Sequence, residues 1–116
     1  MKKFCAIYIG TPAGREQWNK LDEATRKQRE QQGMKGWGDW VTKNKAAIVD
    51  MGSPLGKTKR VDAKGITDAS NAMAAYTIVQ AESHEAAAKL FENHPHFTSF
   101  PGEAVEIMEC LPIPGM

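Results

Sequence analysis

The sequence predicts an α+β fold in which strands and helices alternate along one domain. Three segments of strand length support it, residues 4–9, 76–81 and 104–111, which are rich in apolar, β-branched or alternating residues. Helix-forming residues follow the first two of these segments. With short additional strands between residues 46 and 62 and right-handed connections, this order corresponds to the ferredoxin-like βαββαβ plan, with helices on one face of an antiparallel sheet.

Length, charge and cysteine content narrow the possible classes of protein. The 116 residues suffice for one hydrophobic core, so we expect a single domain over residues 1–116. A formal net charge of +1 argues against a nucleic-acid or membrane-surface binder. No segment approaches the ~20 apolar residues of a membrane span. Cys5 and Cys110 are too few for a disulfide framework, and we expect buried free thiols in a reducing, cytoplasmic compartment.

The N-terminal segment should contain a central strand and a long helix. Residues 4–9 are almost continuously apolar, which is typical of a strand covered on both faces. Thr11 and Pro12 suit a helix N-cap and first helical position. Residues 15–32 are strong helix formers with a narrow apolar stripe, so this helix should be largely solvated. Gly33 should interrupt it before apolar residues resume at helical spacing; close packing or a bend would explain the glycines there.

The middle of the chain is less regular. Residues 46–50 predict a short strand, and residues 51–56, bracketed by glycines, predict a loop. Residues 57–62 alternate and should form a polar strand at a sheet edge. Residues 63–74 are small and polar and predict a surface connection.

The C-terminal part repeats the strand–helix–strand order. After the strand at residues 76–81, Ser83 suits an N-cap, and apolar residues at helical spacing continue to Phe91. Pro95 should end this helix. In the last strand, residues 104–111, Val105 and Ile107 should lie on one face.

Five segments in this order resemble the YCII-related superfamily, also called DGPF-like, and more narrowly its small uncharacterised bacterial members. They are residues 37–41 (WGDWV), 47–56 (AIVDMGSPLG), 76–83 (YTIVQAES), 94–97 (HPHF) and 102–107 (GEAVEI). The resemblance covers roughly residues 34–111. It implies a dimeric α+β barrel, in which two ferredoxin-like protomers pack sheet face to sheet face.

Some members of this superfamily resemble enzymes with a His–Asp pair whose histidine lies on the first helix. This sequence has no histidine before His84, so that pair cannot be assigned by position. The nearest substitutes are His94 and His96, with Asp50 or Asp39 as the carboxylate partner. Imidazole titrates near neutral pH and suits general acid–base chemistry. Alternatively, the histidines simply lie at a helix C-terminus, where a positive charge is favourable.

Other polar and aromatic residues complete the set of candidates. A ligand pocket would be walled by Trp37, Trp40, Ser53 and Tyr8, although core packing also explains the two tryptophans. We expect no metal, because His94 and His96 lack a third ligand, and we expect no cofactor.

Two functions remain open. The preferred one is a small-molecule-binding or accessory homodimer with a cleft beside the sheet. The alternative is a small-molecule enzyme of lyase or isomerase type that uses a histidine–carboxylate pair. The homodimer would form through the sheet face, because the strands are apolar on both faces whereas the helices can cover only one. No nucleic-acid or membrane partner is expected.

Overall fold

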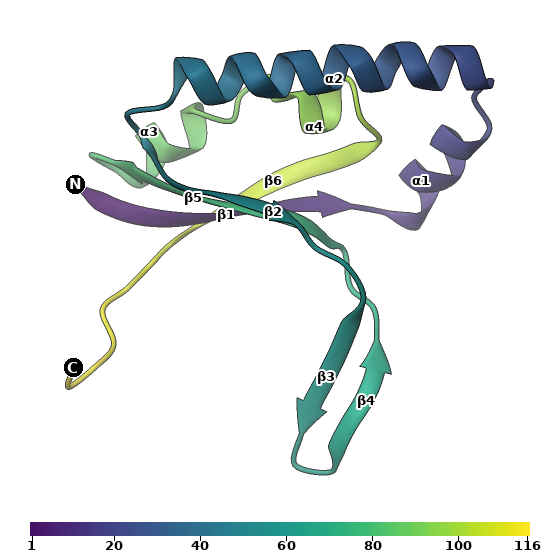
Figure 1. The fold of residues 1–116 in the computed structure, drawn as a ribbon. Helices are drawn as coiled ribbons and strands as arrows, with labels where there is room; N and C mark the ends of the chain where they lie inside the picture. Colours follow the sequence, from purple (N-terminus) through teal and green to yellow (C-terminus); the bar gives the residue numbers. More distant parts are fainter.

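The computed structural model describes residues 1–116, which form a mixed α+β fold (Figure 1). The elements are, in order, β1 (Lys2–Gly10), α1 (Pro12–Asn19), α2 (Glu23–Lys43), β2 (Ile48–Pro54), β3 (Thr58–Asp62), β4 (Gly65–Ala69), β5 (Met73–Ala81), α3 (His84–Lys89), α4 (Pro95–Thr98) and β6 (Gly102–Glu109). Four strands form one antiparallel sheet in the order β2-β5-β1-β6, and β3 pairs with β4 in a separate hairpin. The α+β class is therefore confirmed, and the strand order is consistent with the ferredoxin-like plan.

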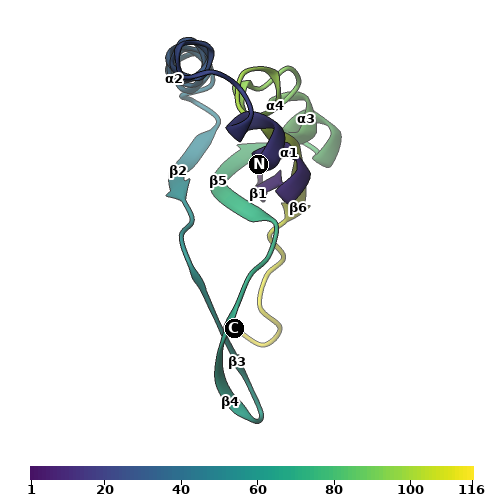
Figure 2. The same cartoon turned by 90° about the vertical axis from the view of Figure 1, so that its right-hand side faces the viewer.

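The helices form one layer above the four-stranded sheet, and the opposite face of the sheet is left uncovered (Figures 1 and 2). The β3–β4 hairpin and the C-terminal tail both project on the uncovered side, in both views. No helix combines the length and the apolar composition that crossing a bilayer requires. We call the uncovered side of the sheet the open face.

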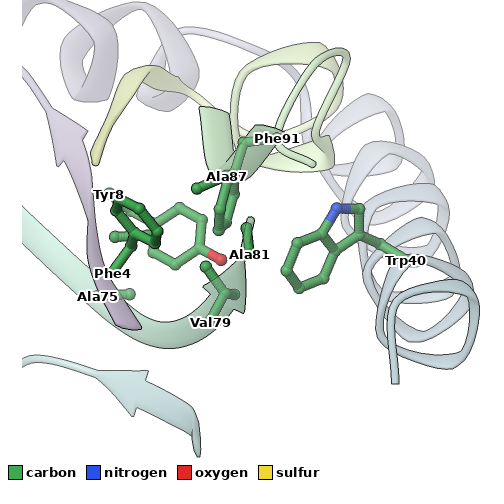
Figure 3. Close-up of a cluster of buried hydrophobic side chains, with 9 residues drawn as sticks. Phe4, Tyr8, Trp40, Ala75, Val79, Ala81, Ala87 and Phe91 are labelled. Atoms are coloured by element: carbon green, nitrogen blue, oxygen red, sulfur yellow. The ribbon is translucent and has the colours of Figure 1, made fainter. Parts of the chain in front are cut away.

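Strand β1 is central, as its continuous apolar run predicts. It pairs with β5 on one side and β6 on the other. Its residues Phe4, Ala6 and Tyr8 face the helices and are fully buried. They meet Val79 from β5 and Phe91, which follows α3, in the core shown in Figure 3. The alternate residues of β1 lie on the open face and are half-buried.

The helical region between β1 and β2 differs from the expectation of one helix that Gly33 interrupts. The break comes earlier, where Asp22 caps α2 by accepting a hydrogen bond from the backbone N–H of Thr25 (3.1 Å). Helix α2 then continues through Gly33 to Lys43. Gly33 is tolerated because the ring of Phe100 packs against its Cα, where a Cβ would collide with the ring. The glycine serves close packing, against a side chain rather than against another backbone.

The middle strands also differ from their predicted boundaries. Strand β2 runs to Pro54 instead of ending at residue 50. Its register with β5 shifts between Asp50 and Ser53, where Gly52 has a φ of 70° and lies so close to the Tyr76 carbonyl that a Cβ would collide with it. The strand predicted at residues 57–62 is β3 (Thr58–Asp62), but it lies in the projecting hairpin instead of at an edge of the main sheet. The predicted connection, residues 63–74, contains β4 and the start of β5. Every residue of β4 is exposed, so no burial pattern marks it in the sequence.

The C-terminal segment follows the prediction at its start and departs from it near Pro95. Ser83 caps α3 by accepting a hydrogen bond from the Ala86 N–H (3.1 Å). Pro95 does not end that helix; it is the first residue of α4, and His94 is the N-cap. His94 therefore starts a helix instead of ending one, whereas His96 does lie in the last turn of α4.

The two cysteines are free thiols, as expected, but they are not both buried. Cys5 is half-buried on the open face, and its burial raises the pKa of its thiol. Cys110 follows β6, where its N–H donates to the carbonyl of Lys3 (2.9 Å), and its side chain is exposed. Exposure arises because Cys110 lies at the edge of the sheet, beyond the last residue of its strand.

Candidate functional site

His94 lies inside the core, in a group of aromatic rings. Its side chain is fully buried. The centroid of its imidazole is 4.5 Å from that of Trp37, 4.8 Å from Trp40, 5.1 Å from Tyr8 and 5.9 Å from Phe91. Three of these residues, Tyr8, Trp37 and Trp40, were expected to wall a pocket. They come together around His94 as a packed cluster, which we call the aromatic cluster.

The hydrogen bonding of His94 sets its tautomer. Its Nδ1 accepts a hydrogen bond from the backbone N–H of His96 (3.0 Å), so in the neutral ring the proton is on Nε2. Nε2 is buried and has no hydrogen-bond partner. Burial, with a smaller contribution from the neighbouring His96, lowers the pKa of His94 to about 4. The imidazole is therefore neutral at pH 7.

His96 contacts the end of β1 and the start of β6. Its Nε2–H donates to the carbonyl of Ile9 at the end of β1 (2.7 Å), and the side chain is 6% exposed. Its ring packs directly on Gly102, the first residue of β6, where a Cβ would collide with it. Burial lowers the pKa of His96, and hydrogen bonds to the carbonyls of Ile9 and Ala104 partly offset this. These contacts give His96 a structural role in joining β1 to β6.

The expected carboxylate partners lie elsewhere. Asp50 is exposed on β2, where its cross-strand neighbour is Ile78 on the open face, and its carboxylate accepts from the N–H of Gly52 (2.8 Å). Asp39 is exposed on α2. No histidine of the chain forms an ion pair with a carboxylate. The structure thus does not bring the predicted histidine–carboxylate pair together.

The remaining predicted pocket residues divide between the core and the surface. Tyr8 is fully buried; its hydroxyl bonds to the hydroxyl of Thr77 (3.0 Å), and burial raises its pKa to about 12. Trp40 is 8% exposed and donates its Nε1–H to the carbonyl of Leu90 (2.7 Å). Ser53 is exposed on β2 opposite Tyr76, on the open face, whereas the aromatic cluster lies on the helix side of the sheet.

A cleft of about 480 Å³ lies next to the start of β6, between α1, α2 and residues 100–103. We call it the α1 cleft. Its aromatic wall is Trp18 and Phe100, and its polar groups belong to Thr11, Gln17, Arg29 and Glu103. The chain turns between α1 and α2 at residues 20–22, and Trp18 of α1 and Arg29 of α2 line the same cleft. Gly14 lets the loop approach, since a Cβ there would lie 2.6 Å from the carbonyl oxygen of Pro101.

Arg29 is the one cation of this cleft. Its guanidinium carbon lies 5.5 Å from the centroid of the Trp18 ring, at cation–π distance. The side chain is half-buried and forms no ion pair or hydrogen bond within the chain. Trp18 is 8% exposed and lies 6.3 Å from the Phe100 ring. The cleft thus combines aromatic walls with an unpaired positive charge.

Sequence reasoning missed these cleft residues. In the sequence, Trp18 is one of the few apolar residues of the segment 15–32, and Arg29 is one of its several charged residues. Phe100 is 71 positions from Arg29, and only tertiary structure brings the two to one cleft. The Thr11–Pro12 capping signal marked the start of α1 correctly, but it does not indicate a ligand site.

A second groove, of about 360 Å³, lies between the segment after α3, α4 and β6. Its lining is mostly apolar, with Phe91, Phe97, Val105 and Ile107, and its two charged residues are Glu92 and Glu103. No cluster of three or more His, Cys, Asp or Glu side chains is placed to hold a metal ion. The charged groups of the second groove are both carboxylates, so it contains no cation that could pair with an anionic ligand.

Comparison with solved structures shows a likeness in fold. No protein-family profile matches this sequence. No curated protein matches it either. The fold is similar to that of 5-chloro-2-hydroxyhydroquinone dehydrochlorinase (TftG) from Burkholderia phenoliruptrix AC1100, solved in complex with 2,5-dihydroxybenzoquinone. The TM-score is 0.52, with 18% sequence identity over 90% of this chain and 89% of that one. The likeness shows that the two chains share a fold.

Proposed function

We propose that this protein is a small-molecule-binding or accessory homodimer and that the α1 cleft is its binding site. The observation that carries the proposal is the cleft itself. Its volume of about 480 Å³ is within the ~300–1,000 Å³ typical of ligand pockets. It lies beside the sheet, since Thr11 follows β1 and Gly102 begins β6. The dehydrochlorinase with its bound quinone supports the idea that this fold accommodates small molecules.

Membership of the YCII-related superfamily, with its ferredoxin-like protomers and dimeric barrel, is part of this proposal. Its support is the ordered set of segments from Trp37 to Ile107 together with the shared fold of the dehydrochlorinase. The strand order β2-β5-β1-β6 agrees with that plan.

The homodimer is proposed through the open face. Apolar or thiol side chains on this face come from all three of the strands β1, β5 and β6: Cys5, Ile7, Ile9, Tyr76, Ile78 and Met108. No helix covers them (Figure 2). A stable interface buries ~800 Å² per partner, and a two-fold arrangement lets the same face serve both copies. The hairpin and the tail, which project on that side, would flank the partner.

Light scattering after size exclusion tests the dimer. We expect twice the chain mass for the wild-type protein and a monomer for Ile7→Lys, because this change puts a charge at the centre of the open face. Met34→Lys is the matched control, since Met34 is 67% exposed on α2, far from that face. A wild-type monomer, or an Ile7→Lys protein that stays fully dimeric, would contradict the proposal.

Ligand-observed NMR with a panel of one-ring aromatic compounds tests the binding site. Ala13 lines the α1 cleft and is exposed, so Ala13→Phe should fill the cleft and abolish binding. Ala24→Phe, an exposed change on α2 that does not line the cleft, should leave binding unchanged. If no compound binds, or if Ala13→Phe binds as well as Ala24→Phe, the α1 cleft is not the site.

The alternative, a lyase or isomerase that uses His94 or His96 with Asp50, has less support from the geometry. His94 is neutral and packed among aromatic rings, and His96 uses its Nε2–H to hold Ile9. Asp50 is exposed on a different strand, with its own partner in Gly52. The arrangement therefore favours binding at the α1 cleft over acid–base chemistry at the histidines.

A further inference from the structure

We propose that the α1 cleft selects planar ligands with a single negative charge, of which an aromatic carboxylate is the simplest representative. Arg29 would pair with the carboxylate while the Trp18 and Phe100 walls hold the ring. The inference rests on the proposed function, because it specifies the ligand class of the same cleft. It uses three features of the cleft: an unpaired guanidinium, aromatic walls and the balance of charges.

The unpaired guanidinium is the first feature. Lys20, which follows α1, and Lys27 on α2 each pair with a glutamate four residues earlier. Arg29 has no such partner, although it is half-buried and has lost part of its hydration. A guanidinium presents parallel N–H donors that match the two oxygens of a carboxylate. A ligand carboxylate would supply the partner that the chain does not.

The aromatic walls are the second feature. The guanidinium of Arg29 lies over the Trp18 ring, and Phe100 lies 6.3 Å from that ring. Gly33 keeps Phe100 in place, because the absence of a Cβ lets the ring pack against α2. A flat ring that enters the cleft would therefore meet aromatic surface next to the positive charge, an arrangement that favours planar over branched ligands.

The charge balance is the third feature. Among the residues that line the cleft, Arg29 is the single cation and Glu103 the single anion. A dianion such as a phosphate monoester would have one cation to pair with and one carboxylate to repel it. A ligand with one negative charge can be neutralised by Arg29 alone and is repelled less strongly by Glu103. The N-terminus of α1 adds to the attraction, since its first turn contains no acidic residue to offset the helix dipole.

Calorimetric titration with benzoate, benzamide and phenyl phosphate tests the selection. Benzamide has nearly the shape of benzoate without its charge. The wild-type protein should bind benzoate at least about tenfold more tightly than benzamide, since a charge-assisted hydrogen bond contributes roughly 1.5–3 kcal/mol. Arg29→Gln should remove this preference, so that the affinities for benzoate and benzamide differ by no more than about twofold in the variant. Arg26→Gln, on the same helix but outside the cleft, should behave as wild type.

The possible results separate this inference from the proposed function. If benzoate and benzamide bind with equal affinity and Ala13→Phe blocks both, the α1 cleft remains the binding site, but the proposed selection for a negative charge is wrong. Tighter binding of phenyl phosphate than of benzoate would overturn the preference for a single charge. If no probe binds at millimolar concentration, both proposals are wrong. Arg29→Gln must still unfold in one cooperative transition, with only the small loss of stability expected from its contact with Trp18. Arg29→Lys should recover part of the preference, because it restores the charge without the paired donors.

Discussion

The aromatic cluster and the α1 cleft show how differently one chain uses its polar side chains. In the cluster, a histidine is enclosed by four aromatic rings, and the pKa of its imidazole falls to about 4. In the cleft, an arginine is half-buried at the rim of a cavity without an internal partner. Both groups are unsatisfied, but only the second has space for a ligand. An unpaired polar side chain therefore indicates a candidate binding site only where a cavity adjoins it, as at Arg29, and not where it is packed in the core, as at His94.

This contrast predicts that changes in the cluster affect stability and changes in the cleft affect binding. The largest effect on stability should come from His94→Ala, which removes a fully buried ring and the cap of α4. We expect the free energy of unfolding to fall by about 3 kcal/mol. Urea unfolding followed by circular dichroism measures it.

His84→Ala is the matched control. His84 is exposed, although its Nε2–H donates to the carbonyl of Ile107 (2.7 Å) and its ring lies 5.3 Å from that of Phe4. Its loss should cost less than about 1 kcal/mol. If His94→Ala costs no more than His84→Ala, then the aromatic cluster is loosely packed, and His94 becomes a candidate for chemistry again.

The pH dependence of stability sharpens the same contrast. The pKa of His94 is lowered in the folded state from 6.5 to about 4, so the unfolded chain binds the proton more readily. The contribution of this histidine to stability is therefore complete above pH 6.5 and is lost as the pH falls towards about 4. His94→Asn keeps a capping side chain but does not titrate.

We expect the wild-type protein to lose more stability than His94→Asn between pH 7.5 and pH 5, measured by urea unfolding at each pH. His96, whose pKa is also lowered, is present in both proteins, so the difference between the two pH profiles reports on His94. Parallel pH profiles for the two proteins would show that His94 is accessible to water and protonated without cost.

A third prediction concerns the hydrogen bonds that hold the cluster. Trp40→Phe removes the bond from Nε1 to the carbonyl of Leu90 and leaves that carbonyl without its partner. Trp37→Phe removes a similar area of ring, but Trp37 forms no side-chain hydrogen bond within the chain. Trp40→Phe should therefore be the less stable variant by about 1 kcal/mol. Equal melting temperatures would mean that ring packing alone positions α2.

The sequence predicts best those elements in which buried side chains recur at the regular spacing of a strand or a helix. The runs at residues 4–9 and 76–81 alternate between helix-facing and open-face positions, and both became central strands. Strand β4 was missed because all of its residues are exposed. The break before α2 depends on a single capping residue, Asp22, whereas Gly33 resembles a breaker but is held inside the helix by its contact with Phe100.

The candidate site was harder to predict for a different reason. A His-Pro-His segment has the same sequence whether the histidines cap and brace a helix or act on a substrate. Burial and partners decide between these roles, and both come from residues such as Trp37 and Ile9 that are distant in the chain. The sequence does show that Arg29 has no acidic partner on its own helix, because the positions three and four residues away are Thr25, Arg26, Gln32 and Gly33. Its position beside Trp18 and Phe100, by contrast, is known only from the tertiary structure.

The smallest effect on stability should come from Arg29→Gln, because Arg29 belongs to the α1 cleft and not to the aromatic cluster. Arginine and glutamine have similar helix propensities, so α2 itself should be unaffected. The change removes the cation–π contact with Trp18, which contributes roughly 0.5–1 kcal/mol at a partly exposed site. We therefore expect a loss of less than about 1 kcal/mol in the free energy of unfolding, measured in urea without ligand. A loss as large as that of His94→Ala would mean that the guanidinium is a structural group, and the cleft would then lack a charge that is free to receive a ligand.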